Sequence, residues 1–157
     1  MKIKKYFIII LLFFYHSTLF AEEWIMDSTA TVNTKSINLP DDIKFSSLDI
    51  VGTWTDNLGF YGRYFCYGII EKNLSTLKLN FFCEMENQHR EKFWYRGKRT
   101  SSDMDAGIGK VVFIKGLGRY KNIKDLECNY AVRYFDNINF VKQKCNVSEK
   151  IITEIKE

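Results

Sequence analysis

The sequence predicts an all-β protein built as an antiparallel barrel of about eight strands. Short runs rich in aromatic and β-branched residues follow one another, with turn-forming residues between them. No segment of helical period is long enough to supply the crossover helices of a parallel sheet. Two cysteine pairs, Cys66 with Cys83 and Cys128 with Cys145, each bracket a run with the pattern of a β-hairpin. Together these features predict hairpins stapled by disulfides.

Residues 1–21 have the three parts of a secretory signal peptide. Lysines come first, an unbroken apolar run spans residues 6–15, and Ala21 precedes two glutamates. The run is shorter than the roughly 20 residues of a membrane-spanning helix. A retained anchor is the alternative, because Leu19 is larger than the residue usual at the third position before cleavage. We expect cleavage after Ala21, an exported protein that is periplasmic or secreted, and no membrane contact afterwards.

Removal of this leader changes the charge of the protein. The whole chain has 23 basic and 19 acidic residues and a net charge of +4. The leader holds three lysines and no acid, so the remaining chain keeps 20 basic and 19 acidic residues, a net charge of +1. A nearly neutral surface gives no reason to expect nucleic acid or an anionic membrane as a partner. The remaining length suits one domain with its own core.

The chain is predicted to have four parts: a signal peptide at 1–21, an N-terminal segment at 22–48, a β-barrel domain at 49–147 and a C-terminal tail at 148–157. The N-terminal segment looks loosely organised, with a strand at 29–34 and a short helical turn at 42–48, after the turn at Pro40. The tail fits either a short helix or a disordered end. Strands of the barrel domain are expected at 51–55, 61–71, 77–85, 91–98, 109–115 and 119–121, followed by a hairpin at 126–145.

The last hairpin has a register that can be counted outward from its turn. Asp136-Asn137 is a turn dipeptide, and a two-residue loop there places Phe135 opposite Ile138. In that register Cys128 lies opposite Cys145, at a non-hydrogen-bonded pair, where Cα atoms are about 4.5 Å apart. This is the short end of the range for a disulfide. The turn therefore predicts a bond between these two cysteines.

The first cysteine pair follows the same logic. A loop at 73–76 places Lys72 opposite Leu77, and the count then brings Cys66 opposite Cys83. Four cysteines allow three connectivities, and the register favours 66–83 with 128–145. Free buried thiols are the alternative, but an exported chain favours disulfides. Each is expected to stabilise the fold by a few kcal/mol.

A glycine pattern gives the chain a family resemblance. Gly107-Ile108-Gly109 and then residues 115–123, Lys-Gly-Leu-Gly-Arg-Tyr-Lys-Asn-Ile, resemble the strand, bend and hairpin of allene oxide cyclase and dirigent-type barrels. The chain also resembles uncharacterised bacterial exported proteins of similar size. The resemblance implies an eight-stranded barrel, allene oxide cyclase-like or lipocalin-like. The catalytic residues of the plant enzymes match no positions here, so no activity is implied. Segments that carry the second resemblance are 53–57, 92–94, 102–107 and 128–145.

Few residues suggest catalysis, and no cofactor is expected. His89 is the only histidine after the leader and lies in a polar run, typical of a solvated hairpin. Asp103 and Asp105 are the most suggestive acids, because alternate aspartates bind calcium or act as an acid–base pair. An enzyme would use them with Arg96 or Arg99. Two aspartates that cap a turn are far commoner, and no metal is expected.

Aromatic residues indicate what the barrel interior holds. An eight-stranded barrel is either filled by side chains or encloses one small ligand. A core packed by side chains is the default. Buried phenols weaken that default slightly because they need hydrogen-bond partners, and Asn139 and Gln143, on the face of the cysteines, would suit a partly wet pocket. Residues expected to line it are Tyr64, Phe81, Tyr130 and Tyr134.

These features favour an exported, disulfide-stabilised barrel that binds a small apolar or amphipathic ligand and is not an enzyme. The alternative is a protein-interaction or inhibitor module that contacts a protein of the cell envelope. That module would use the apolar hairpin tip at 135–140, unless the tip packs under residues 22–48. An enzyme that uses the Asp103 and Asp105 loop is the least favoured of the three.

Overall fold

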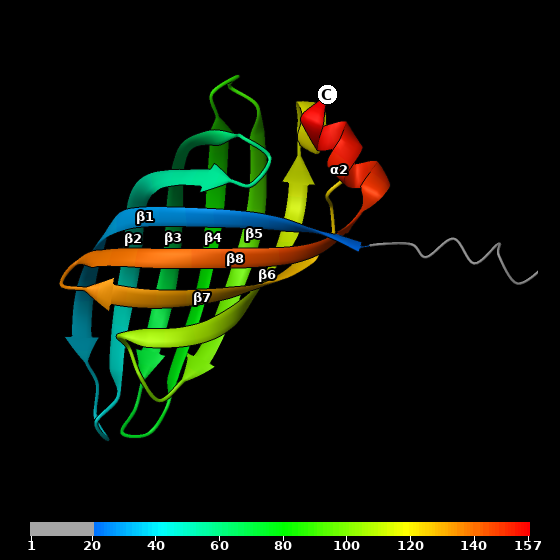
Figure 1. The fold of residues 1–157 in the computed structure, drawn as a ribbon. Coiled ribbons are helices and arrows are strands. Elements are labelled where there is room, and N and C mark those ends of the chain that lie inside the picture. The colour runs from blue at the N-terminus through cyan, green and yellow to red at the C-terminus, as the bar shows by residue number, and fades with distance from the viewer. Residues whose placement is uncertain (1–20) are drawn as a thin grey trace, which may run out of the picture.

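Eight antiparallel strands form a closed barrel in a computed structural model that describes residues 21–157 (Figure 1). Each strand pairs with the next in sequence, and β1 also pairs with β8 to close the sheet. The all-β barrel predicted from the sequence is thus confirmed. The predicted signal peptide lies outside the described residues, except for Ala21. The strands are β1 (Ala21–Asn38), β2 (Lys44–Asp56), β3 (Tyr61–Lys72), β4 (Leu77–Asn87), β5 (Lys92–Ser101), β6 (Ala106–Gly116), β7 (Glu127–Phe135) and β8 (Ile138–Ser148).

The loose organisation predicted for residues 22–48 is wrong, although the strand predicted at 29–34 is present within β1. These residues form β1 and the start of β2, and the helical turn predicted at 42–48 lies mostly within β2. The barrel therefore extends from Ala21 to Ser148. β1 has the alternation of a half-buried strand, with Trp24, Met26 and Ala30 inside. The small residue Ala30 and the polar residue Ser28 weaken the apolar signal of that alternation.

Two short helices complete the fold of residues 21–157. The strand predicted at 119–121 is wrong, because Gly118–Tyr120 forms a 3-10 helix, η1, that begins at a glycine with φ of 59°. The predicted tail is helical: α2 spans Glu149–Lys156, and the Ser148 hydroxyl accepts a hydrogen bond from its first turn. Among residues 21–157 no helix is long and apolar enough to cross a membrane.

Both predicted hairpin registers are confirmed. Phe135 pairs with Ile138 at the β7–β8 turn, and Lys72 pairs with Leu77 across the β3–β4 loop. The sulfur atoms of Cys66 and Cys83 are bonded, with Cα atoms 4.1 Å apart. Those of the second pair are also bonded, with Cα atoms 4.3 Å apart. Each disulfide therefore joins neighbouring strands side by side.

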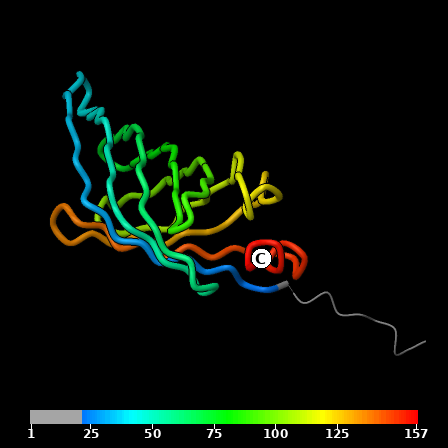
Figure 2. The backbone as a smooth tube through the Cα atoms, turned by 90° about the horizontal axis from the view of Figure 1, so that it is seen from above, coloured from blue at the N-terminus to red at the C-terminus, as the bar shows by residue number. Residues whose placement is uncertain are grey.

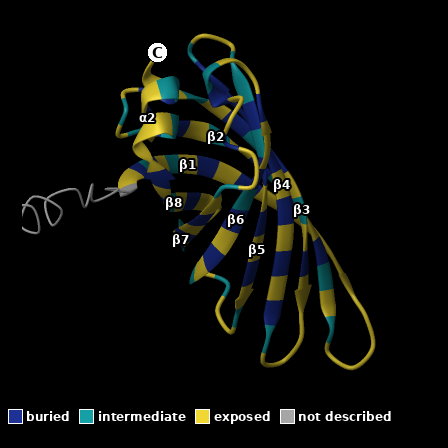
Figure 3. Cartoon of the chain, turned by 90° about the vertical axis from the view of Figure 1, so that its right-hand side faces the viewer, coloured by how far each residue is buried: buried dark blue, intermediate teal, exposed yellow. Residues whose placement is uncertain are grey.

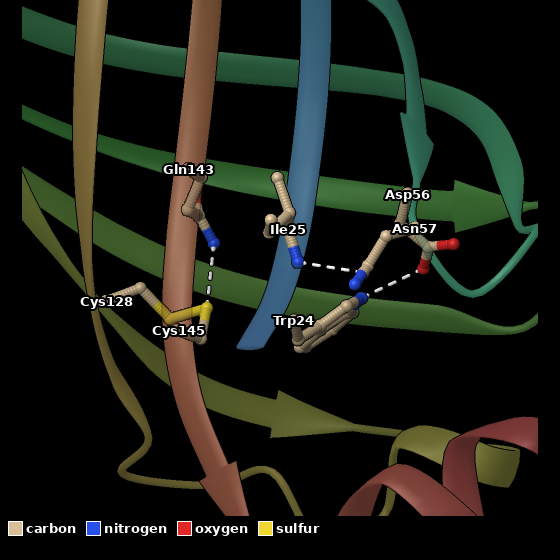
Figure 4. Close-up of a disulfide and its surroundings, with 7 residues drawn as sticks. All are labelled: Trp24, Ile25, Asp56, Asn57, Cys128, Gln143 and Cys145. Atoms are coloured by element: carbon tan, nitrogen blue, oxygen red, sulfur yellow. Dashed lines mark hydrogen bonds between the residues drawn. A yellow bond between two sulfur atoms is a disulfide. The ribbon is translucent and has the colours of Figure 1, made fainter. Parts of the chain in front are cut away.

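The second disulfide lies beside the seam where the barrel closes (Figure 4). Cys145 of β8 pairs with Trp24 of β1 in the closing ladder. The Trp24 indole N–H donates to the Asp56 carboxylate at 2.9 Å, and the Asn57 side chain accepts from the Ile25 backbone at 2.9 Å. These bonds tie the start of β1 to the end of β2.

Aromatic rings fill the end of the barrel that carries α2, which we call the helix end. Trp24 stacks on Phe113 with centroids 5.5 Å apart, and Phe93 lies 4.5 Å from Tyr120. All four side chains are fully buried. Ile155 of α2 is also fully buried and contributes to closing this end. Strands β4 and β5 show regular alternation of buried and exposed residues (Figure 3).

The opposite end carries the loops at 73–76 and 102–105 and the turn at 136–137, and we call it the loop end. The β1–β2 hairpin projects beyond the other strands (Figure 2). β1 pairs with β8 only as far as Thr31, whereas its pairing with β2 continues to Asn38. The barrel thus continues into a two-stranded ribbon.

Candidate binding site inside the barrel

A small cavity lies within the barrel. Its volume is ≈ 40 Å³, which holds roughly three water molecules and is far below the roughly 300–1,000 Å³ of ordinary ligand pockets. The interior is therefore mostly filled by side chains. All four residues expected to line a pocket do border this cavity, namely Tyr64, Phe81, Tyr130 and Tyr134.

Strand alternation places these side chains inside. Tyr64 comes from β3 and Phe81 from β4, on the faces that also carry the first disulfide. Tyr130 and Tyr134 come from β7, opposite Gln143 and Asn139 of β8. The Phe81 ring meets the Tyr130 ring edge-on, with centroids 5.8 Å apart. The cavity is thus lined by apolar side chains and by the polar groups of tyrosine, asparagine and glutamine side chains.

Three polar atoms on the cavity wall have no hydrogen-bond partner within the described part of the chain: the hydroxyls of Tyr64 and Tyr130 and the side-chain oxygen of Asn139. These residues are at most 5% exposed. A buried polar group without a partner costs about 1–3 kcal/mol. Such costs are unusual in native proteins, and they point to a polar occupant of the cavity.

Burial keeps the cavity phenols neutral. Desolvation raises the pKa of Tyr64 to about 12, although Ser28 and Asn139 lie close enough to offset part of the rise. Neither of them makes a hydrogen bond of ordinary geometry with the Tyr64 hydroxyl. Burial also raises the pKa of Tyr130, against a smaller opposing effect of the Arg99 charge. Both hydroxyls can therefore donate or accept a hydrogen bond at neutral pH.

Arg99 is a buried charge at the loop end of this interior. It lies on β5 and is only 2% exposed. Its Nη2 donates to the backbone carbonyl of Met104 at 3.2 Å, whereas Nε and Nη1 have no partner. No acidic side chain of residues 21–157 forms an ion pair with it. A buried charge of this kind is expensive unless something compensates it.

Two glycines of β6 make room for these inward side chains. A Cβ atom at Gly107 would lie 2.9 Å from Arg99 Cδ and Nη1, and one at Gly109 would collide with the Tyr130 ring. Glycines 107 and 109 belong to the pattern that carries the family resemblance. Here they permit a close approach of the β6 backbone to the arginine and the phenol.

Of the residues weighed as catalytic, Arg99 contacts the 102–105 loop through the Met104 carbonyl but forms no ion pair with Asp103 or Asp105. Asp103 and Asp105 are exposed, and the Asp103 carboxylate accepts a hydrogen bond from the Asp105 backbone at 2.8 Å. Arg96 is exposed, while His89 is exposed and lies edge-on to Phe60. Within residues 21–157 there is no group of three histidine, cysteine, aspartate or glutamate side chains placed to hold a metal ion.

A second hollow lies on the outer face of the sheet. This outer groove has a volume of ≈ 640 Å³ and runs across β1, β2, β6, β7 and β8. Ile108 and Phe140 in its lining are 73% and 51% exposed, and Lys142 pairs with Asp27 at 3.3 Å. At the nearby hairpin tip Phe135 is 69% exposed, so the tip does not pack under residues 22–48.

Sequence reasoning missed two polar residues of the interior, Ser28 and Arg99. Arg99 looks like part of a solvated basic run at 96–99. The signal that places it inside is strand alternation, because Phe93, Tyr95 and Gly97 precede it on the buried face of β5. Ser28 lies in β1, where the predicted strand was too short to include it.

Comparison with known proteins leaves the chain without a named family. No protein family, no characterised protein and no solved structure matches it. The eight-stranded barrel implied by the resemblance to allene oxide cyclase and dirigent-type proteins is present.

Proposed function

We propose that this protein is an exported, disulfide-stabilised binding protein whose barrel takes the polar head of a small amphipathic molecule. The observation that supports the proposal is the set of unpartnered polar atoms of Tyr64, Tyr130 and Asn139 around one cavity. A purely apolar ligand would leave all three without partners. A polar head would satisfy them, while the apolar walls would exclude competing water.

The size of the cavity limits what enters. A volume of ≈ 40 Å³ suits a head group of a few non-hydrogen atoms. A longer tail would leave at the loop end, where Met104 and Tyr134 are only partly buried. Met104 has a flexible side chain that can move aside. The ligand is therefore small, or reaches the interior with one end only.

Export is supported by the two disulfides, which are typical of oxidising compartments. We expect protein recovered from outside the cytoplasm to begin at Glu22. N-terminal sequencing of that material tests the cleavage, and a chain that still begins at Met1 would refute it.

Native mass spectrometry of protein recovered from its own cells, without denaturation, tests ligand binding. We expect an extra small-molecule mass that organic extraction removes. Tyr64→Phe and Tyr130→Phe should weaken rebinding by about 2- to 12-fold each, the value of one hydrogen bond. Tyr67→Phe is the matched control, because Tyr67 lies on the same strand but is 66% exposed. No retained mass, and no rebinding by any small molecule, would count against the function.

A second candidate is binding of an envelope protein through the outer groove. It is favoured by the exposure of Phe140, Ile108 and Phe135 on one face, since large exposed apolar groups mark interaction sites. Phe140→Asp should abolish partner capture in cross-linking experiments without loss of folding. Phe82→Asp is the control, because Phe82 is 61% exposed on β4 and lies outside the groove. Equal capture by both variants would refute this candidate.

A further inference from the structure

We infer that Arg99 is the anchor for a negatively charged head group, and that the ligand of the barrel is a small monocarboxylate. The inference rests on the interior binding proposed above and specifies its ligand class. It is carried by a buried guanidinium whose Nε and Nη1 have no acceptor and which no acidic side chain of the described chain neutralises.

The energetics favour a ligand as the missing counter-charge. Removing a cation from water costs several kcal/mol even after the protein relaxes. Elsewhere in the protein a partly buried arginine is compensated: Arg119 donates to Glu91 and also to the Ile155 carbonyl. Arg99 is more deeply buried, yet one backbone carbonyl is its only oxygen acceptor. An anion between the free guanidinium nitrogens and the cavity would remove that cost.

The surroundings hold the guanidinium in place. The Met104 carbonyl fixes Nη2 from the loop end, and Gly107 allows the β6 backbone to lie against the side chain. Tyr130 and Tyr134 border the cavity. Burial raises the pKa of both phenols, and the Arg99 charge is close enough to offset part of that rise. Their hydroxyls are available to donate to the same anion.

One cationic group selects the charge of the ligand. A carboxylate has a single negative charge and balances Arg99. A phosphate dianion would leave one negative charge buried, because no basic residue lies on the cavity wall itself to balance it. The cavity volume of ≈ 40 Å³ also suits a head of three atoms better than a tetrahedral one.

Calorimetry and backbone-amide NMR with butyrate, hexanoate and the alcohols of equal length test this inference. The purified protein should bind each carboxylate at least tenfold more tightly than the matching alcohol. Arg99→Met should abolish that preference, and Arg99→Lys should keep part of it. Arg96→Met is the control, because Arg96 lies on the same strand with its side chain exposed. The affinity for carboxylate should also fall below about pH 4.5, where the acid becomes protonated.

The outcomes separate this inference from the proposed function. If alcohols bind as well as carboxylates, or if Arg99→Met keeps the preference, the anion anchor is refuted while interior binding stands. If no member of either series binds and no ligand is retained from cells, both are refuted. Circular dichroism of Arg99→Met shows that the variant is folded. If it is not folded, the comparison of Arg99→Lys with Arg96→Met decides the question.

Discussion

Individual side chains make the interior of this barrel unusual. The helix end is packed with aromatic rings, whereas the loop end holds phenols, an amide and one arginine with unmet hydrogen-bonding capacity. Of the buried polar side-chain atoms in residues 21–157 that lack a partner, those of Tyr64, Tyr130 and Asn139 border one cavity, whereas the Trp54 indole N–H lies outside it. Their arrangement separates a structural half of the core from a half that is suited to binding.

The buried phenols predict instability at high pH. Tyr64 has its pKa raised to about 12, and burial also raises the pKa of Tyr95, Tyr120 and Tyr130. Tyrosines in the unfolded chain lose their protons near pH 10, so the folded state binds more protons above that pH. Stability is thus fully present below about pH 10 and falls above it, by about 1.4 kcal/mol per pH unit for each such phenol.

Urea unfolding at pH 9, 10 and 11, followed by tryptophan fluorescence, measures this loss. Tyr64→Phe should reduce the slope of stability against pH, because one of the phenols is removed. Tyr67→Phe, at an exposed position, should leave the slope unchanged. A stability that stays constant from pH 9 to 11 would contradict the burial of these groups.

Sequence alone predicted part of this detail. Tyr64, Phe81, Tyr130 and Tyr134 were expected at a pocket, because two hairpin registers fixed which residues share the face of the cysteines. The role of Arg99 was not predicted. A lysine or arginine beside other basic residues usually lies in solvent, and only the pairing of β5 with its neighbours shows which face it occupies.

Among the elements, the two disulfides offer a matched comparison. Both join neighbouring strands, and both have a sequence separation of 17. Loss of either should lower the free energy of unfolding by about 3 kcal/mol, because each closes a loop of the same length in the unfolded chain. The double variants Cys66→Ala/Cys83→Ala and Cys128→Ala/Cys145→Ala, compared by urea titration, measure the two values. A large inequality would show that position, and not loop length, sets the stabilisation.

Helix α2 is expected to stabilise the barrel through its buried face. Ile155→Ala removes a fully buried side chain at the helix end and should cost about 2–5 kcal/mol. Lys150→Ala, at an exposed position of the same helix, should change stability by less than about 0.5 kcal/mol. Thermal unfolding of both variants provides the measurement. Equal stability of the two variants would mean that α2 contributes nothing to the core.

The least predictable element was β1. The final hairpin was predicted residue by residue because a turn dipeptide fixed its register. β1 has no such local partner on one side, since it pairs with β8 at the other end of the chain. The barrel closure that pairs residues 21–31 of β1 with β8 is a long-range event. A local pattern that includes Ser28 and Ala30 does not reveal it.

That closure limits the rate at which the barrel folds. Ala21 pairs with Ser148, so the ends of the barrel sequence must meet before the sheet is continuous. Topologies with such distant pairings fold in milliseconds to seconds, whereas local helical topologies are much faster. Stopped-flow refolding with disulfides intact should fall in the slower range when followed by tryptophan fluorescence. Complete refolding within microseconds would contradict the observed strand order.

The projecting β1–β2 ribbon gives the sheet a free margin at the loop end. The Val32 N–H still donates to the Asn137 carbonyl of the β7–β8 turn. Beyond Val32 the outer backbone of β1 lacks the partner that β8 provides elsewhere, and such margins recruit strands from other chains. That stretch holds the polar residues Asn33, Thr34 and Ser36 and the charged residue Lys35. A polar edge that carries a lysine discourages self-association. Substitutions that make these positions apolar would turn this strand edge into an aggregation site.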